Sequence, residues 1–375
     1  MTSPRPAEAR PPSWLRRDSF PRLLAQLCER FDRVLGPVVR DGAVVQGEIR
    51  DVGDLPRGLR DAQRPGRYRL EADEEDRLFG VVHGPASLKP LVFAPREKLL
   101  QIELEDSGFR VTPELPEAPS TAVVGVRPCD LAALGVQQRT FLEGSVPDPW
   151  FQHRRESLFL VAVSCTRSVE TCFCTSFGTG PEASEGYDLA LTELATGFVV
   201  RAQGAAGHEL LEALALPPAT AELLDREREE LAACAAGIGR RMETEGLPEL
   251  LYARLDHPRW DEVAGRCLSC GNCTLVCPTC FCHDLRDEPR LDGSASERLR
   301  EWDSCFDPDH AQVHGINFRP HVRERYRQWL THKLAGWHEQ FGTSGCVGCG
   351  RCLTWCPVGI DLTEEVAALR EPPHE

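Results

Sequence analysis

The stretch CLSCGNCTLVCP at residues 267–278 and the stretch CVGCGRCLTWCP at residues 346–357 share the pattern C-x2-C-x2-C-x3-C-P. Three thiolates separated by two residues can bind three irons of a cubane from a single turn of chain. The fourth thiolate has to arrive from another direction, and the proline after it prevents the chain from continuing as a helix. The pattern is typical of proteins with two [4Fe–4S] clusters, in which the fourth cysteine of each run ligates the other cluster.

Exchange of the fourth cysteines divides the motif cysteines into two predicted ligand sets. The first cluster is assigned to Cys267, Cys270, Cys273 and Cys356. The second cluster is assigned to Cys346, Cys349, Cys352 and Cys277. A structural zinc site is the main alternative, but zinc ribbons use paired C-x2-C units with four ligands in all, which fits this longer pattern poorly. Electron transfer is the expected purpose of two cubanes.

Composition limits the class of protein. The chain of 375 residues is long enough for two or three domains. Its net charge of −15 argues against nucleic acid and against an anionic membrane surface as partners. We expect no membrane span, because no apolar run approaches the roughly 20 residues that cross a bilayer. The first residues lack the apolar segment of a secretory signal. The 17 cysteines, an odd number in metal-type spacings, favour a reducing cytoplasm.

The predicted fold class is α+β, with an N-terminal α/β domain followed by an α-helical ferredoxin-like dicluster domain. Apolar periodicity predicts a helix over 19–35, buried strands at 122–126 and 158–163, and a hairpin at 188–202. The long spacer between the motifs is expected to be helical. The predicted division is a disordered tail (1–18), the α/β domain (19–205), a helical connector (206–256), the dicluster domain (257–365) and a tail (366–375).

Four further cysteines are expected to meet in the N-terminal domain. If the two buried strands are parallel neighbours, Cys129 and Cys165 lie just past their carboxyl ends, where open α/β sheets bind ligands. Cys172 and Cys174 come from a C-F-C loop that follows. These four thiolates would suffice for a third iron–sulfur cluster; a redox-active thiol pair and a zinc site are the alternatives. A weakness of any metal centre here is that ligands two residues apart strain the chain.

Three more cysteines are expected beside the clusters. Cys280 and Cys282 belong to a T-C-F-C segment directly after the first motif, and Cys305 ends the segment WDSC. Such thiols could make weak hydrogen bonds to the cluster ligands. They could also be alternative ligands or small apolar filler. No dinucleotide-binding fingerprint, phosphate-binding loop or H-E-x-x-H motif occurs, so no nicotinamide, nucleoside triphosphate or zinc-protease site is predicted.

The order of several segments resembles one known family. They are RPCDL at 127–131, CFC at 172–174, GYDL at 186–189, the two cubane motifs, WDSC at 302–305 and NFR at 317–319. This order is similar to that of the β (iron–sulfur) subunit of cytosolic sulfhydrogenases, the NAD(P)-linked [NiFe] hydrogenases, and of the related A subunit of anaerobic sulfite reductase. The resemblance implies an electron carrier in a complex with a flavin subunit that handles NAD(P)H and with a catalytic subunit. It does not distinguish a hydrogenase from a sulfite reductase complex.

The expected function is therefore an electron-transfer subunit rather than a stand-alone catalyst. It would relay single electrons through two [4Fe–4S] clusters between the flavin subunit and a hydrogenase or sulfite reductase catalytic subunit. One alternative is that the four N-terminal cysteines form a sulfur-redox centre of their own. Another alternative is that the protein is a scaffold and the clusters only stabilise its structure.

Overall fold

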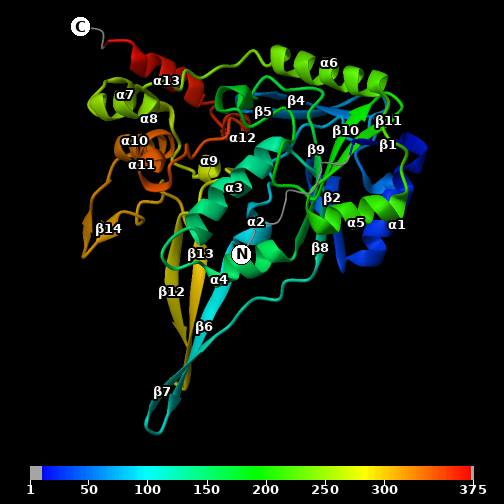
Figure 1. Ribbon diagram of the computed structural model, residues 1–375. Helices are drawn as coiled ribbons and strands as arrows, with labels where there is room; N and C mark the ends of the chain where they lie inside the picture. Colours follow the sequence, from blue (N-terminus) through cyan, green and yellow to red (C-terminus); the bar gives the residue numbers. More distant parts are fainter. Residues whose placement is uncertain (1–10, 373–375) are drawn as a thin grey trace, which may run out of the picture.

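The computed structural model describes residues 11–372, and a seven-stranded mixed sheet forms the N-terminal half (Figure 1). The strand order is β1-β11-β10-β9-β8-β2-β3. The contacts β10–β9, β9–β8 and β8–β2 are parallel, and the others are antiparallel. The strands are Ser13–Arg16 (β1), Arg33–Arg40 (β2), Ala43–Glu48 (β3), Thr121–Val126 (β8), Leu158–Val163 (β9), Leu189–Leu194 (β10) and Gly197–Ala202 (β11).

The pleat of the central strands divides the core into two layers. Val124 of β8 and Val161 of β9 pack on one face with α1 and α5, whereas Val123 and Leu160 pack on the other with α2, α3 and α4. Both faces are covered, which explains why β8 and β9 are continuous apolar runs rather than alternating ones. The helices of this half are Phe20–Arg30 (α1), Lys89–Val92 (α2), Pro128–Leu142 (α3), Pro149–Glu156 (α4), Gly204–Leu214 (α5) and Ala221–Gly237 (α6).

A helical lobe with its own apolar core contains both cubane motifs. Its centre is built from aromatic side chains such as Trp260, Tyr326 and Trp329. The helices are Leu247–Ala253 (α7), Arg259–Arg266 (α8), Asn272–Leu275 (α9), Val322–Thr331 (α10), Trp337–Phe341 (α11), Arg351–Thr354 (α12) and Leu362–Arg370 (α13). A π-helical turn, His332–Gly336, joins α10 to α11. The chain is thus an α+β protein, as its sequence predicts.

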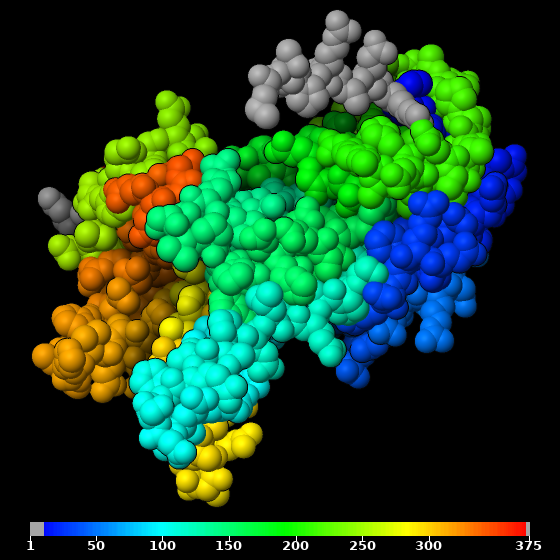
Figure 2. Space-filling model, turned by 60° about the horizontal axis from the view of Figure 1, so that its bottom comes forward, coloured from blue at the N-terminus to red at the C-terminus, as the bar shows by residue number. Residues whose placement is uncertain are grey.

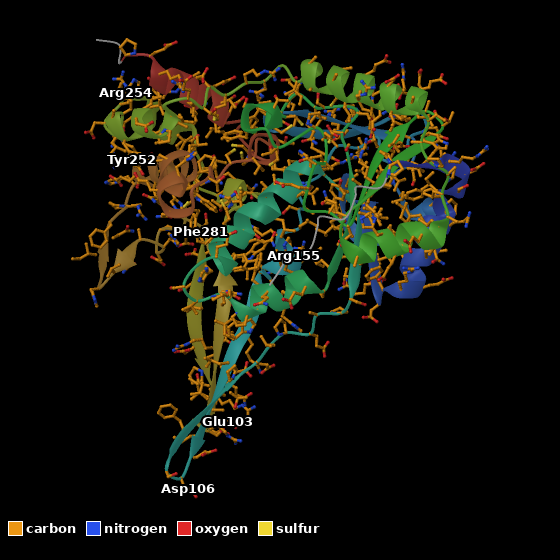
Figure 3. The ribbon with its side chains drawn as sticks, in the orientation of Figure 1. Glu103, Asp106, Arg155, Tyr252, Arg254 and Phe281 are labelled. Carbon is orange, nitrogen blue, oxygen red and sulfur yellow. The ribbon has the colours of Figure 1, made fainter. Side chains whose placement is uncertain are left out.

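A four-stranded antiparallel arm projects from the body, in the order β12-β13-β6-β7. It pairs two hairpins that are distant in sequence, and Figure 2 shows them protruding together. In Figure 3, Glu103 and Asp106 lie toward its tip and Phe281 lies where it joins the body. Its strands are Arg96–Glu105 (β6), Gly108–Pro113 (β7), His283–Pro289 (β12) and Ala295–Trp302 (β13). Two small hairpins complete the strands, Leu59–Arg64 (β4) with Arg67–Ala72 (β5), and Gln312–Val313 (β14) with Ile316–Asn317 (β15).

The arm and β2 correct two expectations about local structure. The spacer between the motifs is not helical throughout, because its first part supplies β12 and β13 and pairs with β6 of the N-terminal half. The predicted helix over 19–35 ends at Arg30 as α1, and Leu35 lies in β2 instead. Gly36 and Pro37 follow at once and cannot extend a helix, so the apolar residues before them pair with β8.

The expected tails and connector also differ from the structure. Residues 13–16 form β1, which pairs with β11, so the N-terminal tail does not reach residue 18; its part at 1–10 lies outside the described residues. At the other end, α13 buries Val366 and Leu369 in the helical lobe, and residues 373–375 lie outside the described part. The connector is not a separate unit, because Leu210 and Leu214 of α5 pack into the core of the sheet.

Candidate cluster-binding sites

The two cubane motifs adopt the same local backbone. In each, the glycine between the second and third cysteine has a positive φ, +72° at Gly271 and +78° at Gly350. Glycine adopts this left-handed conformation without steric strain, and the chain then turns into the short helix α9 or α12, which carries the third cysteine. Pro278 and Pro357 follow the fourth cysteines directly.

The first predicted ligand set lies around one pocket. Its lining includes all four members, Cys267, Cys270, Cys273 and Cys356. The remaining wall is apolar and includes Phe306, Tyr326 and Trp329. Backbone N–H groups are aimed at sulfur: that of Ser269 donates to Cys267 Sγ at 3.4 Å, and that of Ile360 donates to Cys356 Sγ at 3.3 Å.

The second predicted ligand set is recognised by the effect of Cys277 on the pKa of the other three thiols. Burial is the largest cause of the raised pKa of Cys346, Cys349 and Cys352, and in each case Cys277 raises the pKa further. Such electrostatic effects require proximity, so the last cysteine of the first motif lies with the first three of the second. The N–H of Gly348 donates to Cys346 Sγ at 3.4 Å. The two sets adjoin, because Cys352 also lines the pocket of the first set.

A buried lysine stands beside the second set. Lys333 Nζ lies 3.3 Å from Cys277 Sγ, 3.6 Å from Cys280 Sγ and 3.2 Å from Thr279 Oγ1. Burial alone would lower the pKa of Lys333, but Cys277, Cys280 and Cys346 raise it well above its ordinary value. In turn, a hydrogen bond from Cys280, the charge of Lys333 and the Thr279 hydroxyl hold the pKa of Cys277 well below its ordinary value. The site therefore stabilises negative charge on sulfur.

The donor set fits iron–sulfur clusters. Two groups of four thiols, apolar walls and N–H groups directed at sulfur are the features with which proteins bind such clusters and set their potentials. Within residues 11–372, no three His, Cys, Asp or Glu side chains lie close enough together to bind a single metal ion.

The three cysteines expected beside the clusters, Cys280, Cys282 and Cys305, line one open pocket. Cys280 contacts Lys333 and Cys277, as described above. The pKa of Cys282 is lowered to about 4, chiefly by its interaction with Cys305 and further by His310. His310 is hydrogen-bonded to Asp303 through Nδ1, and its pKa is raised to about 9, chiefly by Cys282. His310 and Lys333 line the same pocket.

The four N-terminal cysteines, Cys129, Cys165, Cys172 and Cys174, line one small pocket. β8 and β9 are parallel neighbours, so Cys129 at the start of α3 and Cys165 after β9 emerge at the same edge of the sheet. Cys234 of α6 lines this pocket too, and so does Cys349 of the second motif.

Sequence reasoning missed several residues of these sites. Lys333 and Lys89 are buried, and Lys89 Nζ lies 3.2 Å from the carbonyl oxygen of Thr274, next to the first motif. No local pattern marks a lysine that is buried by distant segments, because lysine is normally exposed. Cys234 had no metal-type spacing. His310 follows the segment WDSC closely, and this was the only available signal for it.

Comparison with known proteins places these features in a class. Residues 266–360 match the model of a 4Fe-4S dicluster domain, which spans both cubane motifs and the spacer between them. The C-terminal part of the chain is thus a dicluster iron–sulfur domain. No solved structure matches the chain significantly.

The family is shown by a relative that matches a longer part of the chain. Over 286 residues the chain is 32% identical to subunit beta of sulfhydrogenase 2 from Pyrococcus furiosus, and the match covers 76% of this chain and 82% of that protein. The chain belongs to the family of sulfhydrogenase β subunits. This membership and the dicluster domain support an iron–sulfur electron-transfer role within a complex of subunits. Within residues 11–372, no helix has the length and apolar character needed to cross a membrane.

Proposed function

We propose that this protein relays single electrons through two [4Fe–4S] clusters, between a flavin subunit that handles NAD(P)H and a catalytic metal subunit of hydrogenase type. The ligands of one cluster are Cys267, Cys270, Cys273 and Cys356. Those of the other are Cys346, Cys349, Cys352 and Cys277.

The interlocked arrangement of the two sets carries this proposal. Each motif contributes its fourth cysteine to the group formed by the other motif, so neither cluster can move independently of its neighbour. Cys277 raises the pKa of Cys273, and Cys352 lines the pocket of the first set, so thiols of the two groups are neighbours. A fixed short separation between two one-electron carriers is what an electron relay requires.

The surrounding residues prepare the sites for electron transfer. When bound, the clusters supply one-electron redox chemistry. Phe306, Tyr326 and Trp329 form an apolar wall of the first site, and N–H groups donate to the ligand sulfurs. Lys333 places a positive charge beside the second site, and this charge favours the reduced state of a cluster bound there. Differences of this kind between two sites set the direction in which an electron moves.

The proposed partners follow from the similarity to a sulfhydrogenase subunit. An anaerobic sulfite reductase complex would use the same relay with a different catalytic subunit. The two alternatives differ in the composition of the complex purified through a tag on this chain. Nickel together with hydrogen-oxidising activity supports the hydrogenase, whereas sulfite reduction without nickel supports the other complex.

The relay is tested in that complex with two matched variants. Cys346→Ala removes a proposed ligand, whereas Cys28→Ala removes a thiol that lies outside all the groups described. Electron transfer from NAD(P)H to an artificial acceptor at the catalytic subunit should be lost in Cys346→Ala and retained in Cys28→Ala. Full activity of an assembled Cys346→Ala complex would refute the relay.

A further inference from the structure

We propose that the N-terminal half holds a third iron–sulfur cluster, bound by Cys129, Cys165, Cys172 and Cys174. The proposal goes beyond the dicluster domain, whose match begins at residue 266. It depends on the geometry of these cysteines and not on the relay proposed above.

The pocket is the first observation. Five cysteines of this half line it: the four proposed ligands and Cys234. Cys129, Cys172, Cys174 and Cys234 are buried, and Cys165 is half-buried beside them. Five thiols that converge from four separate segments are unusual for packing alone.

The C-F-C loop presents two thiols to the pocket. Phe173 lies between them and is fully buried in the core of the helical lobe, where it meets Phe177 edge-to-face. Cys172 and Cys174 lie on the opposite side and line the pocket. Phe173 is not extended, with a ψ of 28°, and Cys174 begins a 3₁₀ turn, so the chain bends between the two thiols. A cluster offers several irons, and the two thiolates therefore need not share one of them.

Buried polar groups without partners form the second observation. His83 lines the pocket and is only 5% exposed. Its Nε2 donates to the carbonyl oxygen of Cys349 at 2.7 Å, and its Nδ1 has no hydrogen-bond partner. The Nη1 of buried Arg351, whose charge acts on Cys129, also has none. The unpaired buried donor of Arg351 is costly, and an anionic group bound by Cys129 would satisfy it.

The charge of the surroundings suits an anionic cluster. Arg127 is buried, and its charge acts on Cys165, while Arg167 lines the pocket. Both are held by backbone carbonyls: Arg127 Nε donates to Val82 at 2.8 Å, and Arg167 Nη1 donates to Gly80 at 2.8 Å. Fixed cations beside buried thiolates offset the desolvation of the negative charge.

The position of the pocket gives the third cluster a neighbour. Cys349 lines it, and Cys349 is a proposed ligand of the second cluster. Glycines of the second motif allow this close approach, because a Cβ at Gly348 would lie 2.5 Å from the carbonyl oxygen of Phe173 and one at Gly350 would lie 2.1 Å from that of Thr171. A third cluster would therefore extend the line of redox centres into the N-terminal half, toward any partner bound there.

The test is the content of iron, acid-labile sulfide and zinc in the full chain, purified without oxygen. At four irons per [4Fe–4S] cluster, three clusters give about twelve irons and two give about eight. We expect about twelve in the natural chain and about eight in Cys172→Ser. Cys234→Ser, which removes the fifth thiol of the same pocket, and Cys28→Ser should both retain about twelve.

Three results would overturn the proposal. The first is about eight irons in the natural chain with no further loss in Cys172→Ser. The second is zinc in place of the extra iron. The third is a loss of about four irons in Cys234→Ser but not in Cys172→Ser. The iron content of the natural chain decides the question even if a variant does not fold. The proposed relay is tested independently, because the assay of Cys346→Ala measures electron transfer and not iron content.

Discussion

Replacing Lys333 by methionine should lower the reduction potential of the cluster bound by Cys277 and the second motif. Methionine has a similar length and no charge. Lys333 is 5% exposed, and its Nζ lies 3.3 Å from Cys277 Sγ. Its positive charge favours the reduced, more negative cluster, so its removal disfavours the added electron.

The size of the shift follows from the distance. At an effective dielectric constant of about 20, two unit charges 3.3 Å apart interact by about 5 kcal/mol. An electron that enters a cluster is spread over several atoms, and doubling the distance reduces the energy to about 2.5 kcal/mol. For a one-electron couple, 1.4 kcal/mol corresponds to about 59 mV, so we expect a decrease on the order of 100 mV.

Potentiometric titration followed by electron paramagnetic resonance measures this shift. Lys333→Arg keeps the charge and should keep most of the potential. Lys98→Met removes the same charge from the arm, where Lys98 pairs with Glu114 at 2.6 Å, and should leave the potential unchanged. Iron content shows whether each variant retains its clusters. An unchanged or higher potential in Lys333→Met at full iron content would refute the electrostatic role.

Three further predictions concern the packing of the sites and their pH dependence. Gly350→Ala forces a left-handed conformation that costs roughly 1–2 kcal/mol and drives a Cβ into Thr171, so it should lower both the melting temperature and the iron content. Phe173→Ala should lower the free energy of unfolding by about 3–5 kcal/mol in denaturant titrations, with a smaller loss for Phe173→Leu. Because contacts with Cys305 and His310 hold the pKa of Cys282 below its ordinary value, its alkylation should be nearly independent of pH from neutral upward. His310→Ala should raise that pKa, and only once the pKa exceeds neutral pH should alkylation at neutral pH slow, by about tenfold for each further pKa unit; mass spectrometry of the labelled peptide measures both rates.

The central sheet could be predicted because its strands carry a local signal. The apolar runs of β8 and β9 are bounded by turn residues, and strands buried on both faces have this composition. Once these strands are parallel neighbours, the proximity of Cys129 and Cys165 follows from the topology. The motif cysteines could be predicted for a similar reason, since the spacing of ligands along the chain reflects the shape of the cluster.

The pairing of the arm could not be predicted, because β12 lacks the alternation of apolar and polar residues that β6 shows from Leu100 to Glu105. All residues of β12 are exposed, and β13 pairs with β6 across nearly 200 positions of sequence. Local periodicity contains no information about such a distant partner. The environment of the clusters was hidden for the same reason: the burial of Lys333 and the meeting of Cys282 with His310 depend on segments brought together only by the fold.

The most direct test of the electron-transfer role is a reductive titration of the anaerobically purified chain, followed by electron paramagnetic resonance. We expect the chain to accept at least about two electron equivalents, one per [4Fe–4S] cluster, with signals altered by the magnetic interaction of neighbouring clusters. A chain that accepts no electrons across the accessible range, or that contains zinc in place of iron, would contradict the account.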